Sequence, residues 1–375
     1  MAELNPLRFR DPKRAEALAA AIGKVCAEIG RDPITLMHVC GSHEQAIARF
    51  GLRTALPKNL EVIMGPGCPV CITDLPEVDE GVALALQGVK VCTYGDMLRV
   101  PGTSMSLAGA QAQGADVQVV YGPAQAVEIA RSTSKEVVFF ATGFETTAVT
   151  TAAALLAGPP PNFSVLSAHK YIPPAMEAVL GMPGSRIEAF LAAGNAAAIT
   201  GWAIFEPLAA RHRVPIVVAG FEPLDILAAV LEALGQLRDG RAEVANLYPR
   251  CVTRDGNEPA LRLLHEVFEV QGGWWRGIAD IPDGNLRLRG PWKRYDARER
   301  FQIDMRSLWD HAPHALAAQC VCGDIMAGKR APTDCGLYGK ACTPETPVGA
   351  CMVSGEGACR IWMQYGGRPD LAEVG

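Results

Sequence analysis

Residues 60–71 read Leu60-Glu61-Val62-Ile63-Met64-Gly65-Pro66-Gly67-Cys68-Pro69-Val70-Cys71, which places two thiols one helical turn apart directly after an apolar run. The apolar run predicts a buried strand and the segment 73–78 predicts a helix start, so the thiols lie at a strand-to-helix turn. The glycines allow close approach of the backbone to a ligand, and the positive end of the helix favours thiolate over thiol. A Cys-x2-Cys pair in this setting serves redox chemistry or forms half of a zinc site, and we favour redox chemistry.

The composition is that of a globular protein with more than one folded unit. The 375 residues are 49% hydrophobic and include 38 glycines and 27 prolines, which suits two or three units. A formal net charge of -5, without a lysine or arginine cluster, argues against nucleic acid or an anionic membrane as partner. The segment 1–14 lacks the apolar core of a signal peptide, and no later segment is apolar enough to span a membrane. We therefore expect a cytoplasmic protein, whose 12 cysteines indicate metal or redox chemistry.

Short apolar runs alternate with helical patterns over most of the chain, which predicts an α/β fold with parallel sheets covered by helices. The predicted strands are 34–39, 60–64, 89–93, 117–121, 137–141, 163–167 and 214–219. They suit two small α/β domains that face a common cleft, with the join near 131–135. The expected units are an N-terminal helix at 1–33 that packs on the C-terminal domain, α/β domains at 34–133 and 134–240, and a cysteine-rich domain at 241–375.

Polar residues follow the predicted strands at the points where the strands end. They are Cys40-Gly41-Ser42-His43-Glu44, Cys68 with Cys71, Gly95-Asp96, Thr142-Gly143-Phe144-Glu145-Thr146-Thr147, His169-Lys170 and Gly220-Phe221-Glu222-Pro223. Ligands of open parallel sheets bind outside the carboxyl ends of the strands, so we expect these residues to converge on one crevice. Glu222 and Asp225 are expected to be ordinary helix-capping or supporting residues.

Half of the cysteines lie in the C-terminal tail. They are Cys320, Cys322, Cys335, Cys342, Cys351 and Cys359. Six thiols in so short a segment of a cytosolic chain point to a metal centre. Structural zinc usually takes two short Cys-x2-4-Cys knuckles, whereas these gaps are mostly long and irregular, so an iron-sulfur cluster is favoured over zinc. Four of the six thiols would suffice, and Cys320 and Cys322 compete for one place.

Taken together, these motifs resemble the HypD family of nickel-iron hydrogenase maturation proteins nearly end to end. The resemblance rests on Cys40-Gly41-Ser42-His43-Glu44, Gly65 to Cys71, Tyr94-Gly95-Asp96-Met97, Gly143 to Thr147, His169 with Pro173-Pro174-Ala175, and Gly220 to Asp225. It also rests on the family spacing Cys-x14-Cys-x6-Cys-x16-Cys in the tail. That spacing selects Cys320, Cys335, Cys342 and Cys359 as ligands of a 4Fe-4S cluster, and it leaves out Cys322 and Cys351.

The resemblance implies a scaffold for the iron unit with two cyanides and one carbon monoxide, the Fe(CN)2CO unit of the hydrogenase active site. The implied partners are a HypC-type chaperone, a HypE-type cyanide donor and, indirectly, the hydrogenase large subunit. Cys40 would hold the iron transiently with a cysteine of the chaperone, and we expect that thiol to be exposed. Cys68 and Cys71 would form a dithiol-disulfide pair fed by the distant cluster. His43, Glu44, Asp96 and Glu145 would support the iron or handle protons.

One segment departs from the family pattern, and two other functions compete with the scaffold. Many members have a Pro-Gly-His segment where this chain reads Ala193-Gly194-Asn195-Ala196-Ala197, so a histidine role there does not transfer. The first competing function is a stand-alone iron-sulfur thiol-disulfide oxidoreductase. The second is an unrelated α/β enzyme whose tail is a structural zinc module.

Overall fold

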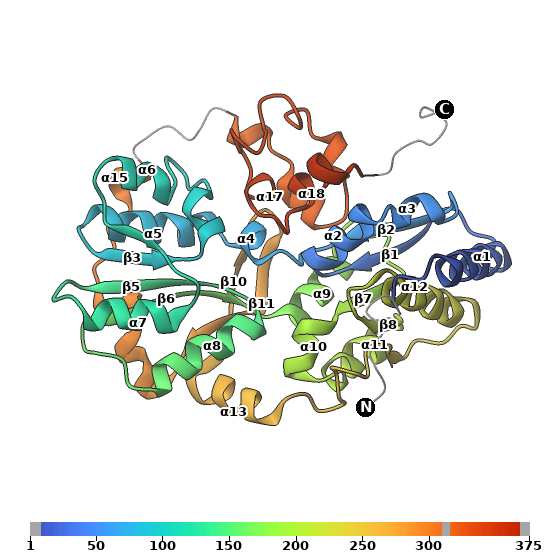
Figure 1. The fold of residues 1–375 in the computed structure, drawn as a ribbon, viewed down its shortest axis with the longest axis horizontal. Helices are drawn as coiled ribbons and strands as arrows, with labels where there is room; N and C mark the ends of the chain where they lie inside the picture. The colour runs from blue at the N-terminus through green and yellow to red at the C-terminus, as the bar shows by residue number, and fades with distance from the viewer. Residues whose placement is uncertain (1–8, 310–315, 368–375) are drawn as a thin grey trace.

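The computed structural model describes residues 9–309 and 316–367 and contains two β-sheets side by side (Figure 1). Sheet A has the strand order β2-β1-β7-β8-β9, and sheet B has the order β10-β11-β6-β5-β3-β4. The C-terminal segment lies above the junction between them. Within the described residues, no helix combines the length and the apolar character needed to cross a bilayer.

Sheet A is parallel throughout. Its strands are β1 (Ile34–His38), β2 (Leu60–Met64), β7 (Ala189–Ala193), β8 (Ile216–Ala219) and β9 (Val244–Asn246). β1 is buried at every position, as expected for a central parallel strand covered on both faces. The helices of this part of the fold are α1 (Pro12–Ile29), α2 (Gly41–Arg49), α3 (Leu52–Ala55), α10 (Gly194–Thr200), α11 (Glu206–His212) and α12 (Pro223–Arg238).

Sheet B is mixed. Its parallel strands are β3 (Lys90–Thr93), β4 (Val117–Val119), β5 (Val137–Gly143) and β6 (Phe163–Lys170). An antiparallel hairpin, β10 (Phe268–Trp275) with β11 (Ala279–Leu288), extends the sheet beside β6. The helices here are α4 (Pro69–Ile72), α5 (Leu75–Leu86), α6 (Leu107–Ala112), α7 (Pro123–Arg131), α8 (Glu145–Leu156), α9 (Ile172–Leu180), α13 (Glu258–Val267) and α14 (Ala297–Arg300).

The α/β class with parallel strands is confirmed, but sheet membership does not follow the predicted domain boundaries. β1 and β2 belong to sheet A with β7, β8 and β9, whereas β3 to β6 belong to sheet B. The predicted unit 34–133 therefore mixes both sheets, as does 134–240, and 241–375 contributes β9 to one and the hairpin to the other. Apolar runs identify strands but not their neighbours, because pairing between distant segments leaves no local pattern.

The expected N-terminal helix forms but does not pack where it was predicted. Asp11 caps α1, and Gly30 ends it in the left-handed conformation. Its buried face, with Ile22, Val25 and Cys26, joins the core of sheet A and packs along α12. The prediction that this helix packs on the cysteine-rich tail is therefore wrong, because α12 and sheet A cover its apolar face.

The cysteine-rich tail packs on the centre of the molecule. It contains the short helices α16 (Cys322–Met326) and α17 (Ala350–Val353), followed by α18 (Ala358–Tyr365). Helices α16 and α17 both contact α4, and α18 contacts α2. The tail thus touches the segments that directly follow β2 and β1.

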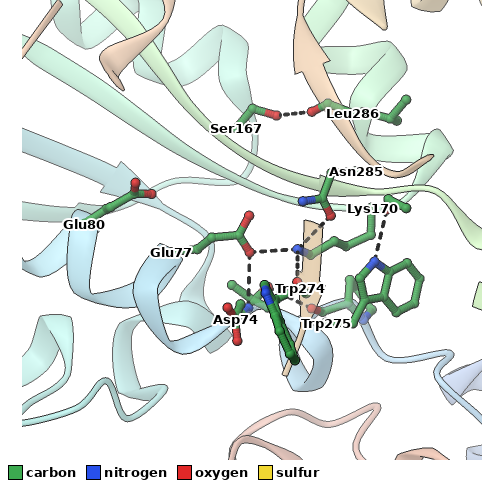
Figure 2. Close-up of polar contacts among 12 residues, drawn as sticks. Asp74, Glu77, Glu80, Ser167, Lys170, Trp274, Trp275, Asn285 and Leu286 are labelled. Atoms are coloured by element: carbon green, nitrogen blue, oxygen red, sulfur yellow. Dashed lines mark hydrogen bonds and ion pairs between the residues drawn. The ribbon is translucent and has the colours of Figure 1, made fainter. Parts of the chain in front are cut away.

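A buried lysine network holds α5 against sheet B (Figure 2). Lys170 Nζ donates to Glu77 Oε2 at 2.8 Å, to Asn285 Oδ1 at 2.9 Å and to the Trp274 carbonyl oxygen at 3.0 Å. Burial alone would raise the pKa of Glu77, but Lys170 and Arg287 outweigh it and lower that pKa to about 2. Because Glu77 Oε2 also accepts the backbone N–H of Asp74, the network fixes the helix start that follows the two thiols.

Lys170→Met should lower the free energy of unfolding by about 3 kcal/mol, because the buried Glu77 carboxylate loses its ammonium partner and keeps Arg287 as its direct ion-pair partner. Lys135→Met is the matched control, since Lys135 pairs with Asp116 at the surface and should cost less than about 1 kcal/mol. Urea denaturation followed by circular dichroism measures both. Equal losses in the two variants would contradict a stabilising role for the network.

Candidate functional site

Cys40 lies at the carboxyl end of β1, as the residue before α2. Its side chain lines a cavity of about 150 Å³ at the junction of the two sheets. The lining comes from segments after β1, β2, β5, β6 and β7 and from the tail, and includes Cys40, Gly67, Phe144, Thr147, Asn195 and Glu356. Ends of strands from both sheets therefore meet at one cavity, but of the strand-end residues predicted to converge only Cys40, Gly143, Phe144, Thr146 and Thr147 line it.

The backbone of Gly67 lies directly against that of Cys40. A Cβ atom on Gly67 would lie 2.1 Å from the Cys40 backbone nitrogen, so no other residue fits without movement of the backbone. The Gly67 carbonyl oxygen accepts the N–H of Gly41 at 3.1 Å. This contact joins the loop after β2 to the start of α2.

Cys68 and Cys71 form a disulfide across the short helix α4. Both side chains are fully buried, and the N–H of Cys71 lies 3.2 Å from Cys68 Sγ. The predicted strand-to-helix turn is confirmed. The pair lies in the same apolar core as Cys40, within reach of the tail helices that contact α4.

The Cys40 thiol is covered, with a relative exposure of 5%. Burial, and after it the charge of Glu356, raises the pKa of this thiol to about 11. Its Sγ lies 4.0 Å from Oδ1 of Asn195, the residue at the departure from the family pattern. The expectation of an exposed thiol is therefore wrong, because elements from both sheets and the tail close over it.

Glu356 is the site residue that sequence reasoning missed. It comes from the tail, and its Oε1 accepts the Ser42 hydroxyl at 3.2 Å. Its backbone approaches α2 so closely that a Cβ on Gly41 would lie 2.5 Å from the Glu356 carbonyl oxygen. Burial raises the pKa of Glu356, opposed by the Ser42 hydrogen bond. The available signal was a single acidic residue in the turn Gly355-Glu356-Gly357, between two tail cysteines.

His43 and Glu44 do not line the cavity. His43 Nε2 lies 3.0 Å from the Gly220 carbonyl oxygen and must donate to it, and burial lowers the pKa of His43 to about 3. Burial would raise the pKa of Glu44, but the bidentate Arg53 pair and His38 outweigh it and hold that pKa well below the usual range. Glu44 is thus held as a carboxylate in a closed ion pair, which does not suit the predicted proton-handling role.

Neither of the other two predicted acids, Asp96 and Glu145, lines the cavity. Asp96 is exposed and accepts the Ser354 hydroxyl at 2.8 Å, close to Glu356 in the tail. Glu145 is buried, and burial raises its pKa to about 7. Its Oε1 accepts the N–H of Ile172 at 2.9 Å, and its Oε2 has no hydrogen-bond partner among the described residues. Phe144 and Thr146 on either side of Glu145 line the cavity, whereas Glu145 itself does not.

The remaining strand-end residues have structural partners. His169 is buried against Phe268, and its Nε2 lies 2.9 Å from the Thr151 hydroxyl. Glu222 pairs with Arg10, and Asp225 pairs with Arg250, as expected for supporting residues.

All six tail cysteines line one small cavity, of about 10 Å³, which they share with Ile325, Tyr338, Gly349 and Met352. A Cβ on Gly349 would lie 2.6 Å from Cys320 Sγ, so this glycine leaves room for the sulfur. In residues 9–309 and 316–367, no three His, Cys, Asp or Glu side chains converge as ligands of one metal ion. The six sulfurs therefore surround a common space without forming a closed mononuclear site. Their chemistry fits a thiolate-bound iron-sulfur cluster.

The comparisons with known proteins agree with these motifs. The family described as "HypD: Hydrogenase formation hypA family" matches residues 13–366. The chain belongs to the HypD family. Its alignment with the hydrogenase maturation factor HypD of Rhodobacter capsulatus spans 368 positions at 40% identity and covers 96% of this chain and 97% of that protein. Its alignment with HypD of Cupriavidus necator spans 379 positions at 41% identity and covers 98% of each chain. Its alignment with HypD2 of Bradyrhizobium diazoefficiens spans 371 positions at 42% identity and covers 96% of each chain.

Alkylation of Cys40 should be slow at neutral pH and should accelerate about tenfold per pH unit between pH 7 and 10, because only the thiolate reacts. Its pKa of about 11 keeps it protonated through this range. Iodoacetamide labelling with peptide mass spectrometry measures the rate, with the exposed Cys251 as internal control. Labelling of Cys40 as fast as Cys251 at pH 7.5 would contradict the buried thiol.

Proposed function

We propose that this HypD-family chain is a scaffold on which the Fe(CN)2CO unit of the nickel-iron hydrogenase active site is assembled with a HypC-type chaperone. The observation that carries the proposal is the position of Cys40, whose thiol lines a cavity between the two sheets near the Cys68–Cys71 disulfide. The maturation-factor names of the relatives support the same process.

In this proposal Cys40 holds the iron of the unit, which is cargo and not a resident cofactor. Thiolate is a suitable iron ligand, and a cysteine of the chaperone would supply another. Because the pKa of the Cys40 thiol is about 11, iron binding must displace its proton. Glu356 and Glu145, whose pKa values burial raises, are placed in or beside the cavity to accept it.

Redox support would come from the pair on α4 and from the tail. The Cys68–Cys71 disulfide takes up two electrons and two protons when it becomes a dithiol. We propose Cys320, Cys335, Cys342 and Cys359 as ligands of a 4Fe-4S cluster, since these sulfurs line one cavity. Such a cluster, when bound, stores single electrons. Because α16 and α17 pack on α4, the proposed cluster would be a neighbour of the disulfide and not a distant centre. This packing supports an electronic link between the two.

The partners follow from the same proposal. A HypE-type protein would donate cyanide, the hydrogenase large subunit would receive the finished unit indirectly, and the work would take place in the cytoplasm. Nucleic acid and membrane have no part in it.

The burial of the disulfide weighs against the alternative of a stand-alone thiol-disulfide oxidoreductase. Cys68 and Cys71 have a relative exposure of 0%, so a protein disulfide does not reach either sulfur without opening of the fold. Insulin reduction by the anaerobically purified chain should therefore stay at the background rate. Turnover that requires Cys68 and Cys71 but not Cys40 would favour the oxidoreductase instead.

Cys40→Ala should abolish the infrared cyanide and carbonyl bands of the protein co-expressed with its maturation partners, because the iron loses its ligand on this chain. The cluster signal in the Mössbauer spectrum should remain, since Cys40 is not among the sulfurs that line the tail cavity. Iron and zinc contents are measured on the same anaerobic samples.

Cys26→Ala is the matched control. Cys26 is also a buried thiol whose pKa burial raises to about 11, but it lies on α1, and its variant should retain all bands. Full iron loading in Cys40→Ala would refute the scaffold. Zinc without iron in the wild-type chain would favour the structural zinc module.

A further inference from the structure

Asn195 supplies an amide side chain to the lining of the Cys40 cavity. It is the second residue of α10, which begins at the carboxyl end of β7. Its Oδ1 lies 4.0 Å from Cys40 Sγ, so the amide and the thiol are neighbours in the same cavity. Within the described residues, Asn195 Nδ2 has no hydrogen-bond partner. The amide therefore has donor hydrogens free for a ligand.

Thr146 offers a second free donor to the cavity. It lies in the first turn of α8, and its hydroxyl makes no hydrogen bond within the part of the chain that the structure describes. The hydroxyl of the adjacent Thr147, by contrast, donates to the Phe144 carbonyl oxygen at 3.0 Å. Helices α8 and α10 pack against each other, and the first turns of both line the cavity. Thr146 and Asn195 are thus brought to one site.

The rest of the lining limits which ligands the cavity can stabilise. Most of its side chains are apolar, and its one charged residue among those described, Glu356, is acidic. No lysine, arginine or histidine in residues 9–309 and 316–367 lines it. A ligand that carries negative charge therefore depends on neutral donors there. Iron-bound cyanide has negative charge on its nitrogen and accepts strong hydrogen bonds, whereas iron-bound carbon monoxide is a weak acceptor.

The amide of Asn195 is poorly suited to bind the iron itself. Carbonyl oxygen is a hard ligand of the kind that Mg²⁺ and Ca²⁺ prefer, whereas thiolate and imidazole suit iron. The side chain at this position therefore acts on the ligands of the iron and not on the metal.

We propose that Asn195 and Thr146 donate hydrogen bonds to the cyanide ligands of the iron on Cys40 and leave the carbonyl to the apolar lining. The inference rests on the proposed scaffold function and assigns the recognition of its cargo to two residues of this chain. Val39, Phe144 and Ile172 supply apolar surface to the same cavity. The cavity thereby distinguishes the two kinds of two-atom ligand by their strength as hydrogen-bond acceptors.

Three variants test the two donors in the full chain co-expressed with its maturation partners. Asn195→Leu and Thr146→Val each remove a donor at nearly constant size, and each should shift the infrared cyanide stretches from their wild-type positions. Asn195→Asp replaces the amide donors by a carboxylate, which repels cyanide, so it should lose most of the cyanide band intensity while the cluster signal remains.

A second measurement needs no iron. In the iron-free chain at pH 8, Asn195→Asp places a carboxylate beside the Cys40 thiol and disfavours the thiolate, so iodoacetamide labelling of Cys40 should slow about tenfold. Asn59→Asp is the matched control, because Asn59 precedes β2 and its amide donates to a backbone carbonyl oxygen outside the cavity. Thr150→Val is the control for Thr146→Val, since Thr150 lies one turn further along α8 and does not line the cavity. Neither control should change the labelling rate or the bands.

Unchanged cyanide bands in Asn195→Leu and Thr146→Val would overturn the inference and leave the scaffold function standing. Unchanged labelling of Cys40 in Asn195→Asp would overturn the placement of the amide beside the thiol. If one variant fails to fold, the remaining two decide. A wild-type chain without cyanide or carbonyl bands, although its partners are present, would refute the proposed function itself and the inference with it.

Discussion

The backbone contact between Gly67 and Cys40 is the constraint on which the site depends. The chain leaves sheet A at residues 65–68 and enters α4 and then sheet B. At that crossing, the missing side chain of Gly67 lets two backbones touch, with the Gly41 N–H bonded to the Gly67 carbonyl oxygen. One contact therefore fixes the start of α2, which Cys40 directly precedes, and the start of α4, where the disulfide lies. A side chain at position 67 would push the two cysteine segments apart.

Buried charge divides the acids of the molecule into two groups. Glu44 and Glu77 are closed in by arginine or lysine, and their pKa values fall despite burial. Glu145 and Glu356 lack a cationic partner in any ion pair within the described residues, and burial raises their pKa values. The first group holds elements together, Glu44 by joining α2 to Arg53 and to Trp362 of α18. The second group lies in or beside the Cys40 cavity, where acids with raised pKa values are useful for proton exchange.

The sequence alone predicts the strands better than their neighbours. All seven predicted strands form, because continuous apolar runs are the signature of covered parallel strands. β7 was missed, since Ala189-Phe190-Leu191-Ala192-Ala193 is short and alanine-rich. The chain crosses between the sheets three times, and no local sequence pattern indicates these crossings.

At the site, the positions of Cys40, Cys68 and Cys71 follow from motif and strand position. Glu356 does not, because it reaches the cavity only by tertiary packing of a segment more than three hundred positions away. The ion pair of Glu44 could not be predicted either, because its partner Arg53 lies outside the motif.

The tail belongs to the site and is not a separate module beside it. Its helices pack on α4 and α2, and it supplies Glu356 to the cavity and the Trp362 N–H to Glu44. The tail cysteines, the disulfide and Cys40 share one apolar core. Interiors are close-packed, so a change in the geometry of α4 is transmitted to the groups that pack on it. Opening the Cys68–Cys71 disulfide would therefore shift the groups both at the cysteine cavity and at Cys40, which gives a physical route from the redox state of the pair to the proposed iron site.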